Sequence, residues 1–143
     1  MKLHYDPTTL HDRYTNAEPF PHIVLDGLFD DDLLDAVLRD FPTPEGMKWR
    51  QFDTPLEKKL GYYHETSTIS NTVRDFLSDM NSFETLLWLE AVTGIEGLIP
   101  DPYFGGGGLR PIEPGGVVWG HADFMYHPKL PLARRLNMLV HLT

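Results

Sequence analysis

Residues 115–124 read Gly-Gly-Val-Val-Trp-Gly-His-Ala-Asp-Phe, and this stretch decides what fold and what site we expect. The glycine pair favours a turn, and the β-branched valines after it favour a strand over residues 117–121. Because side chains two residues apart on a strand point to the same face, His121 and Asp123 are expected to lie side by side. An imidazole and a carboxylate facing one ion make up two thirds of a 2-His-1-carboxylate triad, which holds non-heme Fe(II) and leaves open coordination positions.

The His-x-Asp spacing is weak support by itself. A chain with this composition is expected to contain about 0.6 such pairs by chance, so a match carries a real false-positive risk. A second pair, His4 and Asp6, occurs near the start of the chain, and we assign it no role. The context of the motif therefore has to supply the rest of the argument.

Outward from this stretch, the later part of the chain has the character of a sheet and the earlier part that of helices. Two further strands are expected over residues 109–112 and 136–142, with a flexible turn at the four glycines 105–108. Residues 1–18 show neither helical nor strand periodicity and are interpreted as a loosely held arm. Residues 43–68 are interpreted as a long surface excursion. The order of helices first and strands later predicts an α+β fold, with N-terminal helices packed on an antiparallel sheet.

The earlier elements are predicted from capping residues and apolar spacing. The run from Pro21 to Gly27 suits a short strand that ends in a turn. Asp30 is placed to cap a helix that Pro42 ends, and a second helix is expected over residues 69–80. Asn81 followed by Glu84 forms a capping box for a third helix that ends at Gly94. This third helix is apolar nearly all round and is expected to be buried.

Composition and charge limit the classes of function. A length of 143 residues suits a single domain, and 17 aromatic residues (8 Phe, 6 Tyr and 3 Trp) are enough for a core. A formal net charge of −9 disfavours a nucleic-acid partner. The absence of cysteine excludes disulfides and zinc–thiolate sites and is typical of a cytoplasmic protein. We expect no membrane span and no signal peptide, because no apolar stretch is long enough for either.

Three separated stretches resemble, in order, the prolyl-4-hydroxylase-like group of 2-oxoglutarate and Fe(II)-dependent oxygenases. These stretches are residues 19–26, residues 98–108, and residues 120–124 together with 134–140. The resemblance covers roughly residues 19–143. It implies a double-stranded β-helix (jelly roll), here incomplete, with residues 19–94 as a mainly helical support region and residues 95–143 as its first strands. It also implies hydroxylation with Fe(II), 2-oxoglutarate and O2, on a small molecule or a prolyl peptide.

The resemblance also suggests roles for individual residues. His121 and Asp123 match the first two iron ligands, and no catalytic residue is expected beyond the metal ligands. The other residues implied in the site are His141 and Asn137 for 2-oxoglutarate, and Arg135, His127 and Tyr126 for the substrate. For His127 and Tyr126 a packing role stays open beside the substrate role. Arg134 or Arg135 resembles an arginine near the entrance of the site in family members, and for this arginine a structural role stays open beside the substrate role.

The chain departs from the family pattern after the motif. Family members carry a second iron-binding histidine, and a basic residue that pairs with 2-oxoglutarate, on later strands, whereas this chain ends 20 residues after Asp123. We therefore expect a C-terminally truncated oxygenase whose isolated chain binds Fe(II) weakly and has little or no activity. A second chain or a homo-oligomer is one expected way of covering the open sheet. The alternative is a noncatalytic binding or assembly module derived from the same fold.

Overall fold

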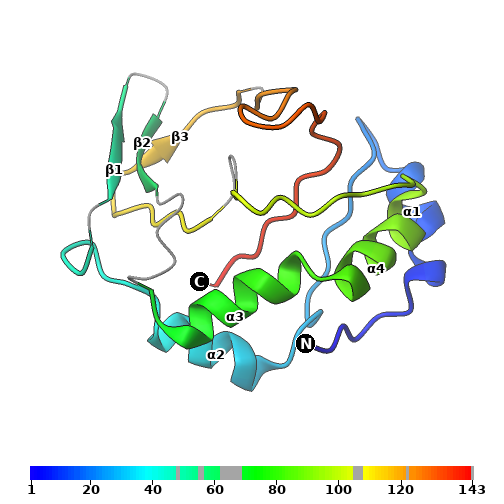
Figure 1. The fold of residues 1–143 in the computed structure, drawn as a ribbon, viewed down its shortest axis with the longest axis horizontal. Helices are drawn as coiled ribbons and strands as arrows, with labels where there is room; N and C mark the ends of the chain where they lie inside the picture. Colours follow the sequence, from blue (N-terminus) through cyan, green and yellow to red (C-terminus); the bar gives the residue numbers. More distant parts are fainter. Residues whose placement is uncertain (48, 55–56, 62–68, 105–107, 122, 143) are drawn as a thin grey trace. The chain divides into compact units, whose positions relative to one another are not determined.

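The computed structural model describes residues 1–47, 49–54, 57–61, 69–104, 108–121 and 123–142. Its elements in chain order are η1 (Pro7–Thr9), α1 (His11–Thr15), α2 (Asp31–Arg39), β1 (Arg50–Asp53), β2 (Glu57–Gly61), α3 (Asn71–Met80), α4 (Phe83–Thr93) and β3 (Val117–Val118) (Figure 1). The chain divides into a first compact unit (Met1–Asp40, Thr72–Pro100 and Met138–Thr143) and a second one (Phe41–Asn71 and Asp101–Asn137). Helices and a small antiparallel sheet occur together, which confirms the α+β class.

The core of the first unit forms where amphipathic helices bury their apolar stripes. Val37 of α2 is 2% exposed and Val73 of α3 is 0% exposed, so both predicted helices turn the expected face inward. Phe29 and Phe76 meet edge to face with ring centroids 5.6 Å apart. The Thr72 hydroxyl donates to Asp40 Oδ2 at 2.6 Å, which joins the end of α2 to the start of α3.

The first residues of the chain are part of this core, so the prediction of a loose arm was wrong. Leu10, between η1 and α1, is only 2% exposed. The Trp88 indole N–H donates to the carbonyl of Tyr5 at 3.0 Å, and His11 Nδ1 lies 3.1 Å from the carbonyl oxygen of Val92. The N-terminal segment is therefore fastened to α4, an association that no local pattern could have revealed.

The two side chains of the second His-x-Asp pair, His4 and Asp6, contact different neighbours. His4 Nε2 lies 2.8 Å from Asp30 Oδ1, whereas Asp6 caps η1 by accepting from the backbone N–H and the hydroxyl of Thr8. The Thr8 side-chain hydrogen bond, helped by the Thr8 backbone N–H, lowers the pKa of Asp6. The two side chains thus serve separate local contacts.

α4 differs from its prediction at its start and in its burial. Ser82, not Asn81, is the N-cap, and its hydroxyl accepts from Thr85 N–H at 3.3 Å. Thr85, Val92 and Thr93 are the helix's buried residues, while Phe83 and Leu87 are 70% and 48% exposed. The expectation of a buried helix was therefore wrong, because uniform apolarity does not say which side of a helix is covered.

Gly94 ends α4 as predicted, with φ at +70° in the left-handed region. Replacing it with alanine is expected to destabilise the protein, because the backbone conformation alone costs an L-residue about 1–2 kcal/mol. The new Cβ would also lie 2.9 Å from His11 Cε1. Urea unfolding measures the change, and Gly27→Ala is the matched control, since Gly27 has φ at +65° but nothing within 4 Å of its added Cβ. An equal loss in both variants would show that His11 does not crowd Gly94.

The second unit contains a three-stranded antiparallel sheet in the order β1-β2-β3. Its first two strands come from the region predicted to be a surface excursion, so strands precede α3 and α4 and the expected order was wrong. Residues 21–27 and 136–142 are not strands, and the predicted strand over residues 109–112 is reduced to a bridge residue at Leu109. The backbone N–H of Leu60 nonetheless donates to the Pro111 carbonyl at 3.2 Å.

None of the helices in the described parts of the chain is both long and apolar enough to cross a bilayer.

Candidate metal centre

The segment that leads to the motif is fixed by close contact between β3 and β2. Glu57 pairs with Val118 and Lys58 with Val117. Gly116 has no room for a side chain, because an added Cβ would lie 2.8 Å from the Lys58 carbonyl oxygen. β3 ends at Val118, so the predicted extension of this strand to His121 was wrong, and His121 and Asp123 stand on irregular chain beyond it.

His121 presents its Nε2 atom toward Asp123. Its Nδ1 atom lies 2.8 Å from the carbonyl oxygen of Trp119, and because a carbonyl only accepts, Nδ1 carries the hydrogen in this contact. In the neutral ring Nε2 then holds the lone pair, and it lies 3.7 Å from Asp123 Oδ1. Metal-binding histidines commonly show this arrangement, in which the second nitrogen donates to a backbone carbonyl.

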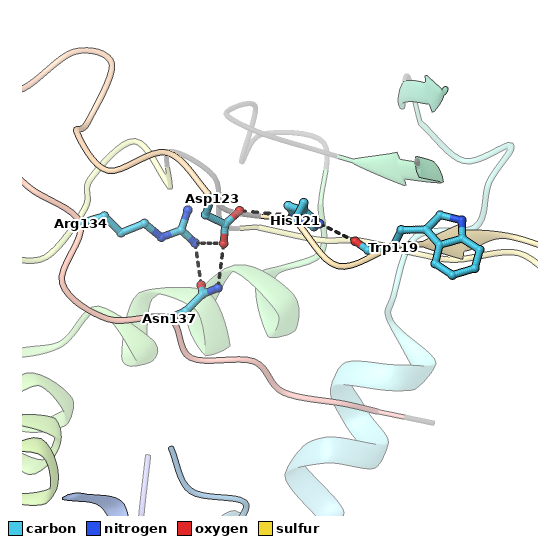
Figure 2. Close-up of polar contacts among 5 residues, drawn as sticks. All are labelled: Trp119, His121, Asp123, Arg134 and Asn137. Atoms are coloured by element: carbon cyan, nitrogen blue, oxygen red, sulfur yellow. Dashed lines mark hydrogen bonds and ion pairs between the residues drawn. The ribbon is translucent and has the colours of Figure 1, made fainter. Parts of the chain in front are cut away.

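Asp123 uses its two oxygen atoms differently. Oδ1 faces His121, while Oδ2 accepts from Asn137 Nδ2 at 3.0 Å and lies 3.3 Å from Arg134 Nη2 (Figure 2). Arg134 Nη2 also donates to Asn137 Oδ1 at 2.6 Å, which closes a ring of three side chains. The His121 and Asp123 side chains are 34% and 33% exposed, so the pair is open to small solutes.

An antiparallel loop brings Arg134 and Asn137 to Asp123. The Arg134 N–H donates to the Met125 carbonyl at 2.8 Å, Tyr126 and Ala133 form a bridge, and the His127 N–H donates to the Leu132 carbonyl at 2.8 Å. Each of these pairings steps one residue along both segments in opposite directions. Continuing this register places the residues around 136 opposite Asp123, which explains why side chains more than ten positions away meet its carboxylate.

His127 holds the tip of this loop. Its Nδ1 accepts from the backbone N–H groups of Lys129 and Leu130 at 3.1 and 3.0 Å, so its Nε2 carries the hydrogen that points to Asp101 Oδ1, 3.1 Å away. The His127 side chain is only 9% exposed and its ring lies 5.8 Å from that of Tyr103. The structure thus gives His127 a packing role in the loop, the alternative that the sequence had left open.

Replacing His127 with leucine is expected to loosen the loop, because two backbone N–H groups and the Asp101 carboxylate each lose a partner. The Lys129 N–H is exposed and the Leu130 N–H is part-buried, so the loss is expected to be smaller than the penalty of about 1–3 kcal/mol for a buried group left without its partner. Amide hydrogen exchange of Lys129 and Leu130 is expected to speed up. His22→Leu is the control, since His22 is exposed and contacts the carbonyl of nearby Phe20. Unchanged exchange at Leu130 in the His127 variant would contradict the role assigned here.

His121 and Asp123 can supply two ligand atoms of a suitable kind to a divalent metal ion. Imidazole and carboxylate ligands bind transition-metal ions at about 2.0–2.2 Å. The separation of 3.7 Å between Nε2 and Oδ1 is shorter than the sum of two such bonds, so it does not keep one ion from contacting both atoms. Two such bonds at a right angle span about 3.0 Å, so in an octahedral site the two side chains would have to move closer together. Within the residues that the structure describes, however, no cluster of three or more His, Cys, Asp or Glu side chains is arranged to hold a metal.

The other residues predicted for the site have different settings. Asn137 donates a hydrogen bond to Asp123 directly, and Arg135 helps to line an open depression of about 270 Å³ beside the carboxylate. That depression is lined by Asp123, Phe124, Met125, Arg134, Arg135, Leu136 and Asn137. Tyr126 is 72% exposed. His141 belongs to the first unit, where it is exposed.

Two contributors were not predicted with their present roles. Arg134 was interpreted as a residue for structure or substrate, but it pairs with Asp123, and its guanidinium lies 4.9 Å from the centre of the Phe124 ring. Asp101 was not singled out, although it anchors His127. Both contacts depend on the loop register, which the sequence does not display.

Comparisons of the chain with protein-family models, curated proteins and solved structures give no match.

Proposed function

We propose that this chain supplies two ligands, His121 and Asp123, to a non-heme Fe(II) centre of the 2-oxoglutarate-dependent oxygenase type. One observation supports this most strongly: Nε2 and Oδ1 face each other 3.7 Å apart while the remaining polar atoms of both side chains are held by the chain itself. We further propose that the small antiparallel sheet is part of an incomplete double-stranded β-helix. The resemblance in the three stretches supports both proposals.

In such a centre the chain's own residues bind and orient. The Trp119 carbonyl fixes the tautomer and the direction of the His121 ring, and the Asn137 amide and Arg134 guanidinium fix the Asp123 carboxylate. When bound, Fe(II) with 2-oxoglutarate and O2 supplies the oxidising power to hydroxylate a C–H bond, with 2-oxoglutarate converted to succinate and CO2. In this proposal Arg135 and Tyr126 contact a small-molecule or prolyl-peptide substrate above the open depression.

A third protein ligand is proposed to come from outside the described residues or from a second chain. Two protein ligands hold a labile divalent ion more weakly than three, and the Arg134 guanidinium beside Asp123 also offsets part of the carboxylate charge. Weak binding by this chain alone is therefore expected.

The test is an anaerobic titration of the chain with Fe(II), with and without 2-oxoglutarate, followed by visible absorption. We expect weak binding that 2-oxoglutarate strengthens, since it would add two ligands to the same ion. His121→Ala and Asp123→Ala are expected to remove this absorption. A wild-type chain that behaves like both variants would reject the iron centre.

The second candidate is a noncatalytic binding module. It is favoured by the exposure of consecutive apolar residues beside the depression, since Phe124, Met125 and Tyr126 are 38%, 72% and 72% exposed. It is favoured also by the lack of a three-residue metal cluster in the described part of the chain. A folded chain that binds neither Fe(II) nor 2-oxoglutarate in the titration would leave this candidate in place of the enzyme.

A further inference from the structure

We infer that Asn137 is a positioning residue that fixes the orientation of the Asp123 carboxylate, so that one of its two oxygens is held toward the metal. This inference rests on the proposed iron centre and deepens it. A carboxylate has two equivalent oxygens, and rotation about its last bond exchanges them, so an unsupported Asp123 would offer either oxygen in a range of directions. The contacts of Asn137 remove this freedom.

The direction of the Asn137 amide follows from its neighbours. A guanidinium can only donate hydrogen bonds, so the atom that faces Arg134 Nη2 at 2.6 Å has to be the amide oxygen. An ionised carboxylate can only accept, so the atom that faces Asp123 Oδ2 at 3.0 Å has to be the amide nitrogen. Both neighbours demand the same orientation, and a flipped amide would lose both bonds.

Arg134 is itself held in place and so keeps the Asn137 amide in this orientation. Its side chain is 17% exposed, its guanidinium rests over Phe124, and its backbone N–H is tied to Met125 in the antiparallel loop. The loop thus positions Arg134, Arg134 orients the Asn137 amide, and Asn137 orients the Asp123 carboxylate. A rotation of the carboxylate away from this orientation would break its bond to Asn137 and its pairing with Arg134, whereas a half turn only exchanges two equivalent oxygens. One oxygen, Oδ1 in the structure, is therefore held toward Nε2 of His121.

The chemistry of the two supporting residues differs in a way that an experiment can use. Arg134 brings a positive charge that opposes a bound cation, whereas Asn137 holds the carboxylate without adding charge. Removing the Asn137 amide is thus expected to weaken metal binding because the Asp123 carboxylate loses its orientation, while the charge near the metal stays the same. Loss of a residue that supports a metal ligand typically lowers metal affinity by about 10- to 100-fold.

The test uses Mn(II) as a redox-inert probe, with free Mn(II) counted by electron paramagnetic resonance, and the full chain as wild type and variants. Asn137→Leu keeps nearly the same volume but offers no hydrogen bond, and Asn137→Gln keeps the amide. Asn16→Leu is the matched control, because Asn16 lies in the first unit and donates to the Asp12 carbonyl at 2.9 Å. His121→Ala and Asp123→Ala report whether the metal binds at the proposed centre at all. Circular dichroism monitors folding, and Asn137→Ala replaces the leucine variant if that variant unfolds.

We expect Asn137→Leu to bind Mn(II) about 10- to 100-fold more weakly than wild type, Asn137→Gln to recover part of the loss, and Asn16→Leu to match wild type. If His121→Ala and Asp123→Ala lose binding while Asn137→Leu keeps it, the positioning role is overturned and the metal centre stands. An equal loss in the leucine and glutamine variants would also overturn it. If wild type binds no better than His121→Ala and Asp123→Ala, the proposed centre fails and the inference fails with it.

Discussion

Replacing Phe76 with alanine is expected to lower the free energy of unfolding by about 3–5 kcal/mol, the range for emptying a buried aromatic site. Phe76 lies on α3, is 7% exposed, and meets Phe29 edge to face at 5.6 Å. The variant loses the burial of a large ring, its contact with Phe29, and the filling of the space between α3 and the turn before α2. Neighbouring side chains close such a space only in part, because protein interiors are densely packed.

Chemical denaturation followed by far-UV circular dichroism measures this change. Phe83→Ala is the matched control, since it makes the same substitution on α4 at a side chain that is 70% exposed. Exposed substitutions usually change stability by no more than about 0.5 kcal/mol. Similar losses for the two variants would mean that Phe76 is not part of the core.

The positions of α2, α3 and α4 were predicted well because their signals are local, whereas η1 and α1 were not predicted. Buried residues mark the predicted inner faces, with Val37 on α2 and with Val73 and Phe76 at helical spacing on α3. Gly94 marked the end of α4 correctly, because glycine adopts the left-handed conformation found there at little cost. Ser82 replaced Asn81 as the N-cap because neighbouring polar residues are equally able to cap, and sequence alone does not choose between them.

The strands were predicted poorly because their pairing is not local. β1 and β2 pair through Gln51 with Leu60 and Phe52 with Lys59, in a region whose polar residues show little strand alternation. Residues 136–142 are mostly apolar, with one β-branched residue, Val140, yet in the described structure they are irregular. Apolar composition favours burial against some neighbour, but it does not specify a hydrogen-bonded partner.

The sequence predicted the central pair of the candidate site, His121 and Asp123, but not the contacts that Arg134 and Asn137 make with Asp123. The side chains of His121 and Asp123 face each other, as their spacing predicted, although β3 already ends at Val118. Arg134 is 11 residues after Asp123 in the sequence, and only the register set by the Tyr126–Ala133 bridge explains their contact. Support of this kind becomes visible only when the loop is folded.

Asp123→Asn is expected to lower the affinity for Mn(II) by more than about 100-fold, beyond the loss of about 10- to 100-fold that follows when only a supporting residue is changed. The substitution keeps the shape of the side chain, and its amide oxygen can still accept from Arg134. It removes the negative charge that attracts a divalent cation and, because the amide oxygen faces Arg134, it replaces the oxygen directed at the metal by an NH2 group, which is not a metal ligand. The change therefore tests the carboxylate as a metal ligand separately from the packing around it.

The control has to exclude diffuse attraction, because a chain with a net charge of −9 concentrates divalent cations near its surface without any specific site. Asp101→Asn serves this purpose, since Asp101 also faces a histidine in the same unit and the substitution removes the same charge. The asparagine oxygen can still accept from His127 Nε2, so the loop keeps this contact. Its Oδ1 lies 3.1 Å from His127 Nε2, closer than the 3.7 Å between Asp123 and His121. His127, however, accepts two backbone N–H groups at Nδ1, so its Nε2 carries a hydrogen and has no lone pair for a metal. We expect Asp101→Asn to bind Mn(II) as wild type does, and equal losses in the two variants would show that the cation responds to total charge and not to the geometry at His121.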